Sequence, residues 1–300
     1  MLHLKGSPEK MLTYLPGGMP ENDFSIPPNI DLLASWQGRP DDFFAEVYVD
    51  IDVAHLWGNF SYREEDESEP DWTADVRLNG GRPLSLLGMD TLIQDVSLSL
   101  NAVGKGFDPK VMDIDLELLI DSLLFNNYQY RDAAITASGS NAVIDVVLRY
   151  DDENLKLYAG NNINLGGEFP ELALSWDLEH LNVHELGFTD ELIAARTTIE
   201  AYAEFREDDF PEGWLELGRT DVLLDREVFT LDSMVFRSSR EEEAYLLEIV
   251  SPVLQAIYRG NVSPSRVPAA LSSHFVTYLE ADQAVSEADT INFELSVDVL

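Results

Sequence analysis

The chain contains no cysteine, and only five of its 300 residues are lysine. The absence of cysteine excludes disulfides, thiolate nucleophiles and cysteine-ligated metal sites. Long apolar runs are also missing. No stretch approaches the ~20 residues of a membrane-spanning helix, and the first residues lack the apolar core of a signal peptide. The final residues stop in the middle of an alternating run, so we expect the chain to be a piece of a longer protein.

Positive charge is scarce throughout the sequence. There are 19 basic residues against 56 acidic ones, which gives a formal net charge of −37. Such a field repels nucleic acid and anionic membrane surfaces, so neither is expected as a partner. The acidic residues are spread along the chain and do not form a tail. This distribution indicates one solvated face of a regular structure.

Period-two alternation is the main pattern in the sequence. Between Met112 and Ile120, apolar residues alternate with Asp113, Asp115 and Glu117. A strand places successive side chains on opposite faces, so each such run predicts one apolar and one polar face. Short loops rich in Asn, Asp, Ser and Gly separate the runs and favour antiparallel return.

The pattern therefore predicts an all-β fold. We expect an elongated antiparallel β-meander that is curved into a groove (a β-taco) and forms one continuous segment over residues 1–300. Two short amphipathic helices are expected near residues 7–15 and 265–280, where Ser7 and Pro8 suit a helix start and apolar residues recur every three or four positions.

The apolar faces allow two architectures. Two sheets closing over a dry core would make a sandwich, whereas one continuous curved sheet would leave an open apolar trough suited to acyl chains. In the open trough, the lining is predicted to be Val47, Val49, Ile51, Val53, Val96, Leu98, Leu100, Ile114, Leu116, Leu118, Ile144, Val146, Leu148, Leu172, Leu174, Trp176 and Leu178.

Catalytic and metal-binding patterns are weak. Acid pairs such as Asp113 and Asp115 are expected by chance among 56 acidic residues. His180 and His184 share a face, but no third histidine is near and no H-E-x-x-H is present. No serine lies in a G-x-S-x-G context, and the glycines around Lys105 indicate a turn and not a phosphate loop. The sequence therefore predicts a protein that is not an enzyme and has no cofactor or metal.

The ordered series of motifs resembles the TamB branch of the AsmA-like envelope proteins, in the form found in Bacteroidota. The matching stretches begin with GSPEKMLTYLP and continue through IPPNIDLLASWQGRP, DWTADVRLNG, LGMDTLIQDVSLSL and DDENLKLYAGNNINLGG to FTLDSMVFRSSREEE. Together with the residues that follow them, these stretches cover most of the chain.

The resemblance implies a long periplasmic protein that is anchored in the inner membrane and reaches toward the outer one. It implies a β-groove that carries phospholipid acyl chains between the membranes and supports outer-membrane protein assembly. The membrane anchor and the contact with an outer-membrane barrel partner would lie outside these residues. Two alternatives remain open: a scaffold whose strand edges pair with outer-membrane proteins, and an acidic β-sandwich that binds calcium or glycan.

Overall fold

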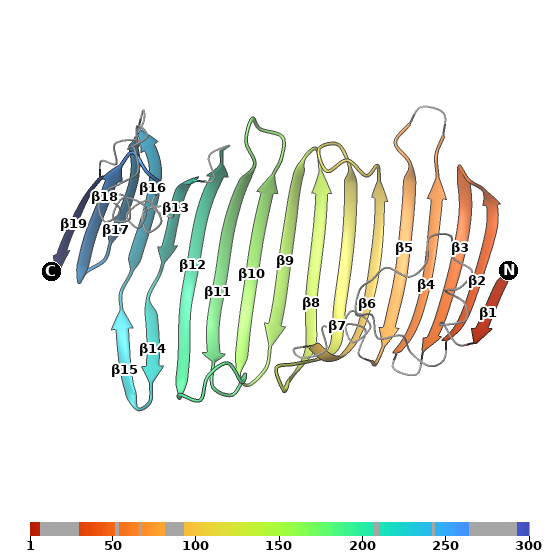
Figure 1. Ribbon diagram of the computed structural model, residues 1–300, viewed down its shortest axis with the longest axis horizontal. Helices are drawn as coiled ribbons and strands as arrows, with labels where there is room; N and C mark the ends of the chain where they lie inside the picture. The colour runs from red at the N-terminus through yellow and green to blue at the C-terminus, as the bar shows by residue number, and fades with distance from the viewer. Residues whose placement is uncertain are drawn as a thin grey trace, which may run out of the picture.

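The computed structural model describes residues 1–6, 30–51, 54–65, 68–81, 93–206, 210–241, 244–263 and 293–299. These residues form 19 strands in a single antiparallel sheet, which runs from the N-terminus at one end to the C-terminus at the other (Figure 1). The predicted all-β antiparallel meander is confirmed. Both predicted helices lie outside the described residues.

The first half of the sheet is a simple meander in which each strand pairs with the next one in the chain. Its strands are β1 (Leu2–Gly6), β2 (Ile30–Arg39), β3 (Asp42–Ile51), β4 (Ala54–Arg63), β5 (Asp71–Asn79), β6 (Ile93–Lys105), β7 (Asp113–Phe125), β8 (Tyr128–Ser140), β9 (Val143–Asp151) and β10 (Leu155–Asn164).

The second half continues the sheet but contains interrupted strands. It comprises β11 (Glu171–Asn182), β12 (Ile193–Phe205), β13 (Pro211–Leu217), β14 (Thr220–Leu224), β15 (Glu227–Leu231), β16 (Met234–Glu241), β17 (Ala244–Val250), β18 (Leu254–Gly260) and β19 (Phe293–Val299).

Two tight turns fix the register of the central hairpins. Asn126 and Asn127 join β7 to β8, and Asn141 and Ala142 join β8 to β9. All four residues have φ between 50° and 67°. Positive φ at both central residues is the feature of the two-residue turn whose twist matches that of paired strands, and asparagine tolerates it better than most residues. The sequence thus sets the pairing of these long strands locally.

At two places in the sheet, two short strands lie end to end where a single long strand would otherwise be. β13 and β14 both pair with β12, β13 over Ile199–Phe205 and β14 over Ile193–Arg196. On their other side, β16 pairs with β13 and β15 pairs with β14. β17 then pairs with β16 but not with β15, so the sheet narrows from this point to β19 (Figure 1).

Three details differ from the sequence analysis. β1 was not predicted, yet it pairs with Ile30–Ala34 of β2. Gly104 and Lys105 belong to β6, and the turn begins only at Gly106. The sandwich alternative is wrong, because every strand among the described residues belongs to the same open sheet. None of the described residues forms a helix that could cross a membrane.

Candidate functional site

The apolar face is built from rows of directly opposed residues that cross the sheet. Opposed residues of antiparallel strands point to the same face, so the register identifies each row. One row runs from β2 to β16 and contains only apolar residues and one glycine. Its members are Ala34, Val47, Gly58, Val76, Leu100, Leu118, Ile135, Leu148, Ala159, Trp176, Ile199, Leu217 and Met234.

A parallel row on the same face extends further, from β2 to β19. Its members are Trp36, Ala45, Phe60, Ala74, Ala102, Leu116, Ala137, Val146, Asn161, Leu174, Ala201, Leu215, Phe236, Ile249, Ala256 and Val297. The row is therefore an apolar stripe across almost the whole width of the sheet. At ~4.8 Å per strand it spans roughly 70 Å.

The register places the predicted lining residues on this face, except Val53, which lies outside the described residues. Val47, Leu100 and Leu118 share the first row, and Leu116 and Leu174 share the second. Ile51 and Val96 are buried, and the other described members are half-buried. The face is thus continuous but only partly shielded from solvent.

One polar side chain interrupts the apolar stripe. Asn161 occupies the second row between Val146 and Leu174. The indole nitrogen of Trp176 donates to its Oδ1 over 2.9 Å, and its own Nδ2 donates to the carbonyl of Val146 over 3.3 Å. Both ends of the amide are therefore satisfied, which removes most of the cost of placing it among apolar residues.

An aromatic row stands at the end of the apolar face near the β2–β3 and β4–β5 connections. Trp36 stacks on Phe43 with ring centroids 3.8 Å apart, and Phe43 stacks on Tyr62 at 5.4 Å. Phe107 continues the row and lies 5.7 Å from Trp72. The Trp72 indole donates to the Gly106 carbonyl over 2.9 Å, which ties the β6–β7 connection to the sheet.

Glycine makes room for this row at one position. A Cβ on Gly104 would lie 2.5 Å from Cζ2 of Trp72, closer than real Cβ atoms approach. The indole therefore rests directly on the backbone of β6. Gly104 and Lys105 are strand residues because both continue the ladders that β6 forms with β5 and β7.

The opposite face is polar and strongly acidic. One of its rows contains Glu46, Asn59, Asp75, Asn101, Glu117 and Thr136. An open depression of about 790 Å³ touches this face, and Ser61, Thr73, Lys105 and Asp115 contribute to its lining. Carboxylates spread over a solvated surface fit the acidic composition, because water screens their mutual repulsion.

A polar cluster closes the opposite end of the central strands. Asp152, in the β9–β10 turn, accepts hydrogen bonds from the Tyr128 hydroxyl over 2.7 Å and from the Tyr150 hydroxyl. It also accepts from the backbone nitrogens of Asn154 and Leu155. Partial burial acts to raise the pKa of Asp152, but these hydrogen bonds outweigh it, so the pKa is below its usual value. Burial first, and then the bond to Asp152, raises the pKa of Tyr150.

His180 and His184, which the sequence analysis considered and set aside as a metal site, lie in different elements of the fold. His180 is in β11 opposite Lys156, whereas His184 lies in the following turn with its Nδ1 3.2 Å from the Thr189 carbonyl oxygen. The described residues contain no group of three or more side chains placed to hold a metal ion. What they do offer is a broad apolar surface with an aromatic border.

Sequence reasoning missed several members of the apolar face. Phe60, Ile135, Ile199 and Leu217 lie in its rows but were not among the predicted lining. Their strands contain short or irregular alternation, and glycine, alanine and threonine fill many neighbouring positions. A search for opposed partners of the predicted residues would have found them, but it needs the strand register.

No protein-family model, curated protein or solved structure matches this chain.

Proposed function

We propose that this chain is a lipid-carrying segment of a longer cell-envelope protein of the TamB type. In this proposal, its apolar face binds phospholipid acyl chains and lets them pass between the inner and outer membranes through the periplasm. The observation that carries the proposal is the apolar stripe from Trp36 to Val297, over which the described residues place no second sheet.

The chemistry of the stripe suits a long flexible hydrocarbon. Exposed apolar area costs about 25 cal/mol per Å² in water, so a face of this extent favours a covering ligand. Most positions of both rows hold alanine, valine, leucine or isoleucine, and neither row contains a charged residue. An acyl chain would therefore find similar contacts at each step of ~4.8 Å and no deep resting place. A surface of this kind favours movement along the sheet over tight binding at one point.

The test compares substitutions on the two faces of the sheet. Leu116 points to the apolar face, whereas Leu119, three residues later in β7, points to the acidic face and is 37% exposed. The purified chain is irradiated with a phosphatidylcholine that carries a photoreactive acyl chain. We expect Leu116→Asp combined with Leu174→Asp to reduce crosslinking at least tenfold, because carboxylates desolvate poorly against hydrocarbon. Leu119→Asp should leave it unchanged.

The position of the adducts gives a second readout that does not depend on the variants. Mass spectrometry of the wild-type chain should find the crosslinks on residues of the two apolar rows. Circular dichroism should show the same strand content in all variants. Crosslinking that survives Leu116→Asp with Leu174→Asp, or adducts concentrated on the acidic face, would contradict lipid binding in this groove.

A second candidate function is support for outer-membrane protein assembly by strand pairing. One observation favours it: the sheet has a free strand edge at β15, away from either end of the chain. Contact with an outer-membrane barrel partner would still come from regions other than these residues.

A further inference from the structure

Where the sheet narrows, β15 (Glu227–Leu231) is paired along only one of its two edges. β15 pairs with β14 along its full length, from Glu227 opposite Leu224 to Leu231 opposite Thr220. Its continuation β16 pairs on the other side with β17, but that pairing begins only at Val235. Among the described residues, no strand lies beside the outer edge of β15 (Figure 1). Five residues of backbone are thus open to an added strand.

The side chains of β15 are exposed on both faces. Glu227, Val228, Phe229 and Thr230 are all exposed, with Val228 at 66% and Phe229 at 54%. In the centre of the sheet, by contrast, exposed and half-buried residues alternate. Natural edge strands usually carry charged or shielding residues at such positions, because an open apolar edge recruits other strands. β15 instead presents two large apolar side chains in succession.

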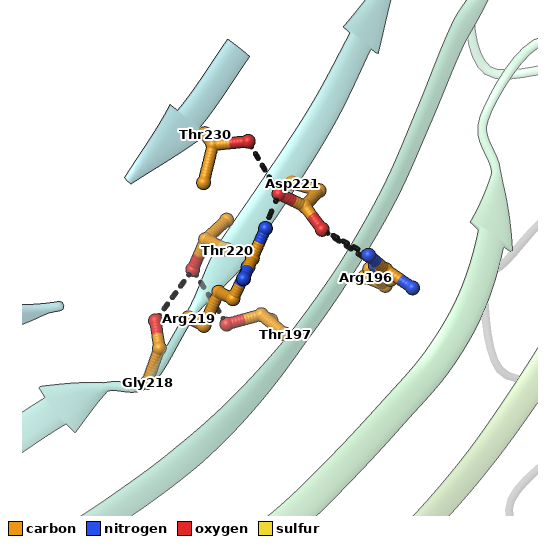
Figure 2. A network of polar contacts seen from close by, with 7 residues as sticks. All are labelled: Arg196, Thr197, Gly218, Arg219, Thr220, Asp221 and Thr230. Atoms are coloured by element: carbon orange, nitrogen blue, oxygen red, sulfur yellow. Dashed lines mark hydrogen bonds and ion pairs between the residues drawn. The ribbon is translucent and has the colours of Figure 1, made fainter. Parts of the chain in front are cut away.

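A polar network holds this edge in a fixed position. Asp221 of β14 accepts a hydrogen bond from the Thr230 hydroxyl of β15 over 2.6 Å and one from Arg196 Nε of β12 over 2.7 Å (Figure 2). Arg219 Nε lies 3.7 Å from the same carboxylate. These partners hold the pKa of Asp221 below its usual value, so it stays charged. The edge is therefore preorganised, which lowers the entropic cost of pairing with it.

The apolar face also ends at this edge. A further row passes through Leu155, Leu181, Ala195 and Val222 and reaches Phe229. A residue of an added strand opposite Phe229 would extend the row by one position. Opposed aromatic and aliphatic residues stabilise strand pairs.

Charge decides which class of strand fits. Asp225, Glu227 and Asp232 flank the edge together with Arg226, while Arg196 and Arg219 are engaged by Asp221. A second copy of a chain with net charge −37 would be repelled. A strand with a basic residue opposite Glu227 would instead be attracted.

We propose that β15 receives an extended segment of another polypeptide by antiparallel strand addition. The segment carries apolar residues opposite Val228 and Phe229 and a lysine or arginine opposite Glu227. Backbone hydrogen bonds supply the affinity, and the two apolar contacts with the ion pair supply the specificity. This inference rests on the second candidate function, strand pairing at a free edge, and its test measures peptide binding at β15, so it can fail without bearing on lipid binding by the two apolar rows.

The experiment uses a fluorescent peptide with the core Val-Thr-Ile-Val-Lys, acetylated, amidated and flanked by lysine, and measures its anisotropy with the full chain. Two control peptides carry N-methyl groups on one or the other alternate set of core residues. Only one set of amides faces β15 in an antiparallel pair. We therefore expect one control to bind at least tenfold more weakly and the other to bind within threefold of the parent.

Two protein variants test the position of binding. Glu227→Lys should weaken the peptide at least fivefold. Glu216→Lys changes the charge equally but lies in β13, which has a neighbour on each side, so it should change binding less than twofold.

Three results would overturn the proposal: no binding of the parent peptide, equal binding of both methylated peptides, or an equal effect of the two lysine variants. Amide hydrogen exchange of the free chain supplies a further check. The outward amides of β15 should exchange freely and become protected with peptide. Protection before any peptide is added would show that the edge is already occupied.

Discussion

The centre of the sheet and its narrowed end are made of the same kind of strand but differ in how many neighbours each strand has. From β6 to β12, each strand is paired on both sides, and β7 alternates between exposed and half-buried residues over most of its length. At β15, one neighbour is missing and four successive residues are exposed. The two neighbours of β7 therefore leave one of its faces shielded, whereas the missing neighbour of β15 leaves both of its faces exposed.

The carboxylates of Asp152 and Asp221 show the same difference between the centre of the sheet and its free edge. Asp152, at a turn of the central strands, accepts hydrogen bonds from two buried or half-buried tyrosines and two backbone nitrogens. Asp221, beside the free edge, is held by exposed Arg196 and Thr230. Both have a lowered pKa, but the side-chain partners of Asp152 are shielded from solvent, whereas those of Asp221 are exposed. We expect the central carboxylate to contribute more to stability.

Asp152→Ala should produce the largest loss. It leaves the Tyr128 and Tyr150 hydroxyls and two backbone nitrogens without their acceptor, and hydrogen bonds to a charged group are worth about 1.5–3 kcal/mol. We expect a loss of about 3 kcal/mol in the free energy of unfolding, measured by urea denaturation. Asp221→Ala should cost clearly less. Equal losses for the two variants would contradict the comparison.

Lowering the pH should remove the stabilisation that the Asp152 carboxylate provides, without any mutation. A carboxyl whose pKa is lowered in the folded state stabilises above its unfolded value of 3.8, and the stabilisation is lost as pH falls through the lower folded value. The difference in unfolding free energy between wild type and Asp152→Asn should therefore be constant from pH 5 to 7. It should shrink below pH 3.8. A difference that grew in acid would contradict the assignment.

Two glycines within strands should respond oppositely to alanine. At Gly104 a Cβ would meet the Trp72 ring at 2.5 Å, whereas at Gly160 its nearest neighbour would be the Ser175 carbonyl oxygen at 3.5 Å. Gly104→Ala should cost about 1–3 kcal/mol through overpacking and should blue- or red-shift tryptophan emission. Gly160→Ala should be neutral or stabilise by up to about 1 kcal/mol, because glycine weakens a strand. Thermal melts of both variants measure the contrast.

The smallest effect is expected at the edge itself. Val228→Thr replaces a side chain that is 66% exposed, so the unfolding free energy should change by less than about 0.5 kcal/mol. Val146→Thr makes the same change within the second apolar row and should cost about 1 kcal/mol, because the hydroxyl is partly desolvated. If both variants lost the same stability, the edge would be as well packed as the centre.

Several local features of the fold could be predicted from the sequence. The strict alternation from Met112 to Ile120 indicates β7, and the same argument from Ala45 to Val53 indicates most of β3. Asparagine suits three of the four positions in the turns at Asn126–Asn127 and Asn141–Ala142, where φ is positive. These predictions work because side-chain direction and turn conformation are decided within a few residues.

Other features depend on distant partners. β1 has only five residues and gains its strand conformation by pairing with Ile30–Ala34. Gly104 belongs to β6 because it is paired with Trp72 of β5, 32 positions earlier, and with Ile114 of β7. Asn161 is a polar residue within the apolar stripe. Its amide is tolerated there because it is hydrogen-bonded to Trp176 and to the carbonyl of Val146. None of these partners follows from a local pattern.

The sequence by itself determined that the chain forms antiparallel strands with one apolar and one acidic side, since alternation and turn residues act at short range. Only the tertiary structure decided that these sides join into one open sheet without a second layer among the described residues, and that the sheet narrows beyond β15. The reason is physical: a strand's period fixes which way a side chain points, but its neighbours are fixed by hydrogen bonds between residues that the sequence does not place together.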